Sequence, residues 1–515
     1  MFTKVYCGLV LSSVLFAQTL QPPQTLTVVS ATNKQVQLRW TAGDTTANAY
    51  VIERKPLGGD YSALSTATST TANDTNFDPY TAYVYRVRGT LQSNQSGPSN
   101  EVTVGPPPYG YNTAVPYPSK LDPYYSGEFG KAVVMIADAS GDPAMAYTWD
   151  DPNNDGDYSD SAVFFARWDR AHYQWTKPVQ VHLVGEVSGY TLTPISVAQD
   201  AGNGVFGIAF EDESDEQTGR MQFALSTDGG ATWKTANVAV DDGTEEYQRP
   251  SLAMAGGNVY LSFYHDFDGI RYVTGKQSDD PAKWTSTLVP LPGGYDSYER
   301  ESSLALDARG VPAVAFWVSG DNGMGEAFWR PGGSSILIYD NQGNNTDEPD
   351  IRLTFSGNQP RVAVYGYLDD NYYVDYDHTM WVITSPDNGT TWSRPVNIVS
   401  DLGTDLNGPM SIAAGPQGQS AIVMETNGGN GTSNCSQPKL TMSGDQVNWT
   451  TCGTETAGKV SITAGSPNIY FSGNGRLFLA FQQTDSGNDN SAPLGILVWR
   501  QPPDWAFPPP PPPQD

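Results

Sequence analysis

The sequence predicts an all-β protein, and three observations carry that prediction. Charged residues make up 16% of the 515 residues, whereas Gly (52), Pro (38) and Tyr (28) are abundant, a composition typical of short strands joined by turns. Apolar and polar residues alternate through many segments, as they do in strands with one buried face. Beyond residue 122, a pattern of strand, Gly-rich turn and apolar strand recurs with a period of about 55 residues.

The first residues have the features of a secretory signal peptide. Lys4 precedes an apolar run from Val5 to Phe16, which is too short to span a bilayer comfortably, and Ala17 follows. We assign residues 1–17 to the signal, with cleavage expected after Ala17. The mature protein is expected to be secreted or on the cell surface, with no transmembrane segment.

Residues 24–105 show the alternation expected of a two-sheet sandwich. The strand "VQLRWTA" places Trp40 at a core position, and "AYVIERK" supplies the next strand. This segment resembles a fibronectin type III domain, with Tyr83 where that family has its corner tyrosine and residues 97–99 before the last strand. The resemblance implies a β-sandwich that acts as a spacer or a binding accessory. Residues 106–122 are assigned to a stiff linker and to a strand that could close the ring described next.

Residues 123–506 contain seven copies of the recurring unit, and tryptophans count them independently. The separations between successive tryptophans are 58, 51, 108, 57 and 56 residues, for Trp175, Trp233, Trp284, Trp392, Trp449 and Trp505. The gap of 108 residues equals two periods, so the unit near residues 299–346 lacks its tryptophan. Four strands per unit and seven units predict a seven-bladed β-propeller, with six blades as the alternative. Residues 507–515 form a proline-rich tail, expected to be an extended rod or simply disordered.

Two stretches, "STDGGATW" (226–233) and "SPDNGTTW" (385–392), share the pattern Ser-x-Asp-x-Gly-x-Thr-Trp. Asp accepts backbone N–H bonds, Gly takes a positive φ and Trp packs beneath, so the pattern suits a hairpin turn. It resembles the Asp-box, or bacterial neuraminidase repeat, of sialidase-like propellers. There the turn joins the third and fourth strands of a blade, away from the catalytic pocket, so the resemblance implies architecture rather than activity. The residues assigned to this structural role are Ser226, Asp228, Gly230, Trp233, Ser385, Asp387, Gly389 and Trp392.

Three consecutive units begin their first strands with "EEYQRPS", "SYERESS" and "NTDEPDIR". First strands surround the axis of a propeller, so these charged residues are expected to gather at the channel mouth. Arginine forks bind carboxylates, and paired acids serve glycosidic cleavage. Glu301 and Asp350 are the candidate catalytic residues. The candidate ligand-binding residues are Arg249, Arg300, Arg352, Glu348, Tyr247 and Tyr298.

The sialidase resemblance further implies an arginine triad, a tyrosine–glutamate nucleophile pair and an acid/base aspartate. This sequence departs from that pattern, because the Phe/Tyr-Arg-Ile-Pro element of sialidases precedes the first Asp-box. The nearest stretch here, "YQRP", follows Asp228. The resemblance therefore assigns neither the nucleophile nor the acid/base residue to a position.

The net charge of −28 argues against binding to nucleic acid and to anionic lipid. Much of it falls in loops expected on the same face as the first-strand entrances, either as solvated loops or as sites for a divalent cation or a basic or hydroxyl-rich ligand. The stretch "DPNNDGD" has the oxygen-ligand spacing that opens a calcium loop, although Ala162 stands at the twelfth position in place of Glu. The candidate calcium ligands are Asp151, Asn153, Asp155, Asp157 and Asp160.

Two cysteines remain after removal of Cys7 with the signal. Cys435 and Cys452 flank a predicted hairpin with its turn near Ser443 and Gly444, and both are equally far from that turn. They are expected to face each other and to form a disulfide in an oxidising compartment, with two free thiols as the alternative.

These features predict a monomeric binding protein that recognises an extracellular ligand, expected to be glycan, with calcium as the one cofactor considered. The alternative is a sialidase-like exo-glycoside hydrolase, with Arg249, Arg300 and Arg352 as the clamp and Glu301 or Asp350 as acid/base. A second alternative is a structural surface or matrix component. Carboxylates about 5–10 Å apart in a concave mouth would favour hydrolysis. The same residues paired with each other along strands would favour structure.

Overall fold

The computed structural model describes most of the chain in fifteen segments. They are residues 19–113, 128–150, 161–184, 195–212, 219–240, 247–266, 268–320, 323–342, 350–367, 378–399, 410–424, 439–446, 448–453, 467–483 and 495–502. Contacts divide the chain into one compact unit of Met1–Pro106 with Arg170–Tyr173, and a second of Pro107–Asp169 with Gln174–Asp515. The described residues are all-β apart from a 3-10 turn at Pro281–Lys283. No helix among them is long and apolar enough to cross a membrane.

The first unit is a sandwich of two sheets, in the orders β1-β2-β5 and β4-β3-β6-β7, with β8 also paired to β6. Trp40 is 3% exposed and meets Tyr50 edge-on in the core, with ring centroids 5.4 Å apart. The hydroxyl of Tyr83 accepts a bond of 3.3 Å from the backbone N–H of Asp78, as a corner tyrosine does. The strands are β1 (Gln24–Ala31), β2 (Val36–Thr41), β3 (Ala49–Pro56), β4 (Ser62–Ala67), β5 (Thr71–Asp74), β6 (Tyr83–Leu91), β7 (Asn94–Pro98) and β8 (Val102–Val104).

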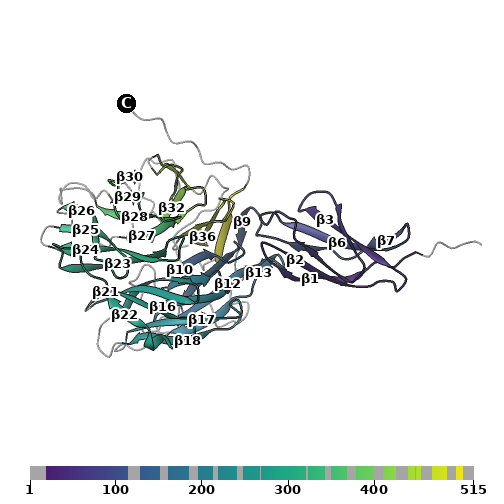
Figure 1. The fold of residues 1–515 in the computed structure, drawn as a ribbon, viewed down its shortest axis with the longest axis horizontal. Helices are drawn as coiled ribbons and strands as arrows, with labels where there is room; N and C mark the ends of the chain where they lie inside the picture. The colour runs from purple at the N-terminus through teal and green to yellow at the C-terminus, as the bar shows by residue number, and fades with distance from the viewer. Residues whose placement is uncertain are drawn as a thin grey trace, which may run out of the picture. The chain divides into compact units, whose positions relative to one another are not determined.

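The described strands of the second unit form seven antiparallel sheets in succession (Figure 1). The first two sheets contain β10 (Glu128–Ala137), β11 (Pro143–Asp150), β12 (Ser161–Asp169), β13 (Gln174–Trp175) and β14 (Val179–Val184), then β15 (Ile195–Asp200), β16 (Val205–Asp212), β17 (Arg220–Ser226) and β18 (Lys234–Val240). The third and fourth contain β19 (Tyr247–Ala255), β20 (Asn258–His265), β21 (Gly269–Lys276) and β22 (Thr285–Leu288), then β23 (Ser297–Leu306), β24 (Pro312–Gly320), β25 (Gly323–Trp329) and β26 (Ile336–Gln342). The fifth and sixth contain β27 (Asp350–Ser356), β28 (Gln359–Tyr367), β29 (His378–Thr384) and β30 (Val396–Val399), then β31 (Met410–Ala414), β32 (Ser420–Met424), β33 (Lys439–Ser443) and β34 (Thr450–Gly453). The seventh contains β35 (Asn468–Phe471), β36 (Leu477–Gln483), β37 (Gly495–Arg500) and β9 (Gly110–Thr113).

The seven sheets close into a ring, which makes this unit a β-propeller. The first strands contact one another in the order β10, β15, β19, β23, β27, β31 and β35, and β35 contacts β10 again. The seventh sheet takes its outer strand from the start of the unit, because β9 pairs with β37 in the register Leu497↔Thr113 to Arg500↔Gly110. This pairing leaves β37 with no open edge on that side and ties the two ends of the ring together.

Aromatic wedges join neighbouring sheets. Three tryptophans, each following the third strand of its sheet, pack against a phenylalanine on the third strand of the preceding sheet. The pairs Trp233–Phe165, Trp284–Phe223 and Trp392–Phe328 all have ring centroids 5.0 Å apart, with interplanar angles of 62–63°. At these three positions the tryptophan therefore packs between sheets, whereas Trp175 also meets Trp168 of its own sheet edge-on, with ring centroids 5.8 Å apart.

The residues of the Ser-x-Asp-x-Gly-x-Thr-Trp pattern build the turn that places this wedge. Asp228 accepts bonds from the backbone N–H and the hydroxyl of Thr232, at 2.9 and 2.6 Å, and from the Ser226 hydroxyl at 2.8 Å. These bonds stabilise the carboxylate and lower the pKa of Asp228 to about 2, the side-chain bond from Thr232 contributing most. Gly230 has a φ of 90°, and its N–H donates to Ser226 Oγ at 2.8 Å. The second copy repeats the pattern around Asp387.

The hairpin before Cys452 has a different register from the one predicted. Leu440 on β33 lies opposite Cys452 on β34, because the Asp-box-like turn between the strands occupies residues 444–449 and is centred beyond Gly444. The expectation that the two cysteines face each other directly across the hairpin is therefore wrong. Cys435 and the side chain of Cys452 lie outside the described residues, so the disulfide itself stays a prediction.

Candidate functional site

The axis of the ring encloses a cavity of about 150 Å³. Residues from all seven first strands, or directly before them, line it: Val133, Val134, Ile195, Ser196, Arg249, Pro250, Ser251, Ser302, Ser303, Arg352, Leu353, Met410, Ser411, Ile412, Pro467 and Asn468. The lining contains several small polar side chains and two arginines. The charged residues predicted at the channel mouth therefore include two that reach the axis.

Irregular pairing at the start of two first strands brings charged side chains together. The register between β19 and β20 shifts between Gln248 and Ser251, and Arg249 in this bulge has a φ of 55°. The register between β23 and β24 likewise shifts between Tyr298 and Ser302, around Glu301. Bulges re-aim side chains, so these two local irregularities place Arg249 and Glu301 in contact.

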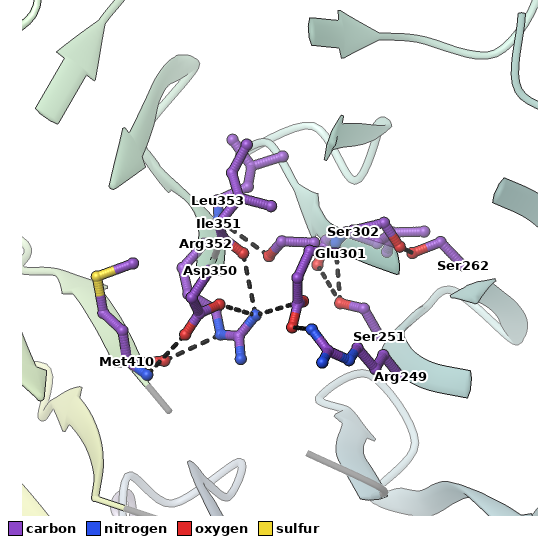
Figure 2. A network of polar contacts seen from close by, with 12 residues as sticks. Arg249, Ser251, Ser262, Glu301, Ser302, Asp350, Ile351, Arg352, Leu353 and Met410 are labelled. Atoms are coloured by element: carbon purple, nitrogen blue, oxygen red, sulfur yellow. Dashed lines mark hydrogen bonds and ion pairs between the residues drawn. The ribbon is translucent and has the colours of Figure 1, made fainter. Parts of the chain in front are cut away.

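Arg249, Glu301, Arg352 and Asp350 form one ion-pair network across three adjacent first strands (Figure 2). The Glu301 carboxylate is 1% exposed and is bound by Nη1 of Arg249 on one oxygen and by Nη1 of Arg352 on the other, the latter at 3.2 Å. The same Nη1 of Arg352 lies 2.6 Å from Oδ1 of Asp350. Two cations and two anions thus balance one another where burial would otherwise make each charge costly.

The network is also attached to the next first strand. The backbone N–H of Met410 on β31 donates to Oδ2 of Asp350 at 2.7 Å, and Nε of Arg352 donates to the Met410 carbonyl at 2.9 Å. Burial raises the pKa of Asp350 to about 6, while the Arg352 charge acts in the opposite direction. Asp350 is therefore a buried carboxyl with both oxygens engaged by the protein.

Asp350 belongs to a larger set of bonds that we call the acceptor girdle. In each member, a side-chain oxygen of one first strand accepts the backbone N–H of a residue on the next first strand. The six bonds are Ser196 from Leu252 (3.0 Å), Ser251 from Leu304 (2.8 Å), Ser303 from Leu353 (2.9 Å), Asp350 from Met410 (2.7 Å), Ser411 from Ile469 (3.3 Å) and Asn468 from Met135 (3.1 Å). The girdle satisfies backbone donors that face a neighbouring sheet rather than a paired strand.

Sequence reasoning missed the girdle, although a signal for it exists. Serine precedes leucine or isoleucine in the phrases "PSLA", "SSLA" and "MSIA" at the start of the third, fourth and sixth units. Each such serine supplies the acceptor, and the girdle explains why the phrase recurs along the chain. The cavity lining is therefore polar because its side chains make the hydrogen bonds of the girdle, whether or not a ligand binds.

Two guanidinium N–H groups of the network have no partner. Nε of Arg249 and Nη2 of Arg352 are buried, and neither donates a hydrogen bond to any described residue. Arg249 is 5% exposed, and both arginines line the axial cavity. A buried donor without an acceptor costs about 1–3 kcal/mol, so these two groups are suited to receive an oxygen acceptor from outside the chain.

The remaining predicted site residues do not join this network. The hydroxyl of Tyr298 donates to the carbonyl of Val289, and its ring packs on Phe316 with centroids 6.3 Å apart. Tyr298 therefore lies in packing between sheets and does not line the axial cavity. Glu348, the side chains of Tyr247 and Arg300, and the calcium candidates Asp151, Asn153, Asp155, Asp157 and Asp160 lie outside the described residues. Within the described segments, no group of three or more His, Cys, Asp and Glu side chains could hold a metal ion.

Comparison with known proteins identifies the first unit. Residues 21–105 match the family model of the fibronectin type III domain. That segment is a fibronectin type III domain. No curated protein matches the chain.

Several solved structures resemble the chain at low identity. The α-L-arabinofuranosidase Arb93A from Fusarium graminearum is 12% identical with a TM-score of 0.43, over 76% of this chain and 98% of that one. The intramolecular trans-sialidase from Ruminococcus gnavus is 11% identical with a TM-score of 0.39, over 76% and 97%. The rhamnogalacturonan lyase from Bacillus licheniformis is 14% identical with a TM-score of 0.39, over 94% and 90%. These are distant likenesses, and the assignment of the propeller rests on the strand pairings above.

Proposed function

We propose that this chain is a secreted binding protein whose propeller recognises an extracellular glycan at the axial end formed by Arg249, Glu301, Asp350 and Arg352. The observation that carries the proposal is the pair of buried guanidinium N–H groups without partners beside the axial cavity. Carboxylate and hydroxyl oxygens are the acceptors that such donors bind, and sugars carry both. The alternative of a structural component leaves these two donors without a role.

The size of the cavity limits how a glycan would bind. A volume of about 150 Å³ is below the roughly 300–1,000 Å³ of typical ligand pockets. The cavity therefore accepts one polar group of the ligand, such as a carboxylate or a hydroxymethyl group. The rest of the glycan would extend beyond the cavity, toward the acidic loops that the sequence predicts around this axial end, and a calcium ion at residues 151–160 is proposed for the same surface.

Binding is favoured over hydrolysis by the state of the two candidate catalytic residues. Glu301 is held between two arginines, which occupy both of its oxygens. Asp350 is held by Arg352 and by the Met410 N–H as a member of the girdle. One observation favours the hydrolase alternative, namely that burial raises the pKa of Asp350 to about 6, which suits a general acid.

A glycan array probed with the full chain, with and without calcium, tests the proposal. Arg352→Lys keeps the charge that balances Glu301 and Asp350 but removes the Nη2 donor, so it is the informative variant. We expect wild-type binding to at least one glycan and about tenfold weaker binding by Arg352→Lys, the cost of one charge-assisted bond. Lys34→Ala in the fibronectin type III domain is the control. Equal binding by wild type and Arg352→Lys would contradict the axial site.

A further inference from the structure

A second cavity lies at the outer edge of the propeller, between the fourth and fifth sheets. Its volume is about 630 Å³, which lies within the range of ligand pockets. On one side are Ile338 and Tyr339 of β26, and on the other is the segment Trp392–Asn397, which leads into β30. We call it the rim groove, and it shares no residue with the axial site.

A proline creates the rim groove. In the second sheet the fourth strand, β18, begins at Lys234, directly after the Asp-box residue Trp233. In the fifth sheet, β30 begins only at Val396, because Pro395 has no N–H to donate and disfavours a regular strand. Ser393 still bonds to Thr384 of β29, its N–H donating to the Thr384 carbonyl at 2.8 Å and its Oγ accepting from the Thr384 N–H at 3.1 Å. The regular pairing is therefore interrupted at Arg394 and Pro395.

The groove presents aromatic surface together with hydrogen-bond donors. Trp392 and Tyr339 are half-buried and line it, and the indole N–H of Trp392 is already used, donating to the Gly389 carbonyl at 3.1 Å. What remains of Trp392 for a ligand is ring surface. The side chains of Arg394 and Asn397 are exposed at the groove. Neither side chain forms a hydrogen bond or an ion pair with another described residue.

This combination fits a sugar. Aromatic rings stack on the apolar face of a pyranose, while guanidinium and amide N–H groups bind its hydroxyl or carboxylate oxygens. A proline-rich peptide also binds aromatic grooves. It offers few hydrogen-bond acceptors, however, to the two exposed donors Arg394 and Asn397. We propose that the rim groove is a second glycan-binding site, which holds a short oligosaccharide on Trp392 and Tyr339 through Arg394 and Asn397.

Two sites on one propeller imply that the protein binds long or clustered glycans more strongly than short ones. Binding of the second site becomes intramolecular once the first is occupied, which raises the overall affinity of a polysaccharide that reaches both. The gain in affinity for long glycans rests on the proposed axial site, whereas the rim site is proposed independently of it.

The test is calorimetric titration of the full chain with cellotetraose, xylotetraose and chitotetraose as neutral probes and tetragalacturonate as the acidic probe. Arg394→Ala and Asn397→Ala remove exposed donors and leave the wedge of Trp392 intact. Lys234→Ala is the matched control, since it removes an exposed cation beside the Asp-box of the second sheet. We expect at least one probe to bind, about tenfold more weakly to Arg394→Ala, and within twofold of wild type to Lys234→Ala.

The acidic and neutral arms separate the two glycan chemistries. If Arg394→Ala weakens the binding of tetragalacturonate alone, the ligand is a carboxylated sugar. If it weakens the binding of a neutral probe, the groove recognises hydroxyl groups. Binding that Arg352→Lys weakens but Arg394→Ala does not would belong to the axial site, and would overturn the rim proposal. So would the absence of binding to all four probes, or Arg394-dependent binding of the peptide FPPPPPPQD with none of the sugars.

Discussion

Trp329 on β25 packs edge-on against Tyr272 on β21, with ring centroids 5.3 Å apart and an interplanar angle of 73°. Its indole N–H donates to the Gly333 carbonyl at 3.0 Å, as that of Trp233 donates to Gly230 at 3.1 Å. The fourth sheet has no Asp-box tryptophan, and Trp329 fills the corresponding place from the end of the third strand. The wedge between sheets is therefore retained where the motif is lost.

Trp329→Ala is expected to destabilise the propeller by about 3–5 kcal/mol, because it removes a large side chain that is 3% exposed. Ile336→Ala on the neighbouring β26 is the control, since Ile336 is 41% exposed and its loss should change stability by less than about 0.5 kcal/mol. Urea unfolding followed by tryptophan fluorescence and circular dichroism measures both. Equal midpoints for the two variants would show that Trp329 is not a wedge.

Gly230→Ala is expected to cost more than Gly332→Ala, although both glycines have a positive φ, 90° and 84°. A Cβ at Gly230 would lie 2.1 Å from Cε1 of Phe165, whereas one at Gly332 would meet no heavy atom within 4 Å. Both variants lose about 1 kcal/mol because alanine disfavours a positive φ, and in Gly230→Ala crowding against Phe165 adds about 1–3 kcal/mol. The difference in unfolding free energy between the two variants measures the close approach alone.

Glu326 on β25 makes stability depend on pH. Burial raises its pKa to about 8, while the neighbouring Trp381 indole N–H acts in the opposite direction. The folded state therefore holds a proton that the unfolded state releases near pH 4.3, so stability falls as the pH rises between about 4.3 and 8. Glu326→Gln removes this dependence and should gain on the order of a few kcal/mol relative to wild type between pH 5 and 8. Urea unfolding at several pH values measures the difference in unfolding free energy between Glu326→Gln and wild type. A difference that stays constant across this range would contradict a raised pKa for Glu326.

Asp350 also makes the stability of the propeller depend on pH. The effect has the same sign as that of Glu326, but it is smaller and occurs at lower pH. Its pKa of about 6 is above the unfolded value of about 3.9, so its contribution to stability falls between about pH 4 and 6 and is constant above. Asp350→Asn keeps an oxygen for the Met410 N–H and should gain on the order of 2 kcal/mol relative to wild type over that interval. Thermal unfolding of both proteins at pH 4, 5, 6 and 7 checks this, with no further gain expected between 6 and 7.

Much of the fold could be predicted from the sequence, because the signals are periodic. The repeat of about 55 residues follows the succession of sheets, and the spacing of Trp233, Trp284 and Trp392 follows the wedges that these residues form. The register around Cys452 could not be predicted, because it depends on how many residues the turn after Ser443 takes up. The sequence pattern placed the turn at residues 443 and 444, whereas the hairpin closes around Gln446.

The axial residues were predicted as neighbours, but not as partners. Which side chains turn toward one another depends on the bulges at Arg249 and Glu301. Pro250 lies in the first bulge, whereas the second contains neither glycine nor proline. Five of the six girdle bonds join residues about 50–60 positions apart, and the sixth joins residues 333 positions apart. A single sequence carries no sign of such pairs beyond the repeated serine. Asp350 illustrates the result, since a candidate acid proves to be a girdle acceptor, while Arg352 stands where Ser251, Ser303 and Ser411 stand in other sheets.

Turnover of a panel of fluorogenic glycosides, sialosides and α-L-arabinofuranosides included, tests most directly whether the axial network binds rather than cleaves. The account predicts no turnover by folded wild-type protein that binds glycans on the array, at any pH between 4 and 8. Turnover that Asp350→Asn abolishes without unfolding the propeller would contradict it, and would make Asp350 the acid of a glycoside hydrolase.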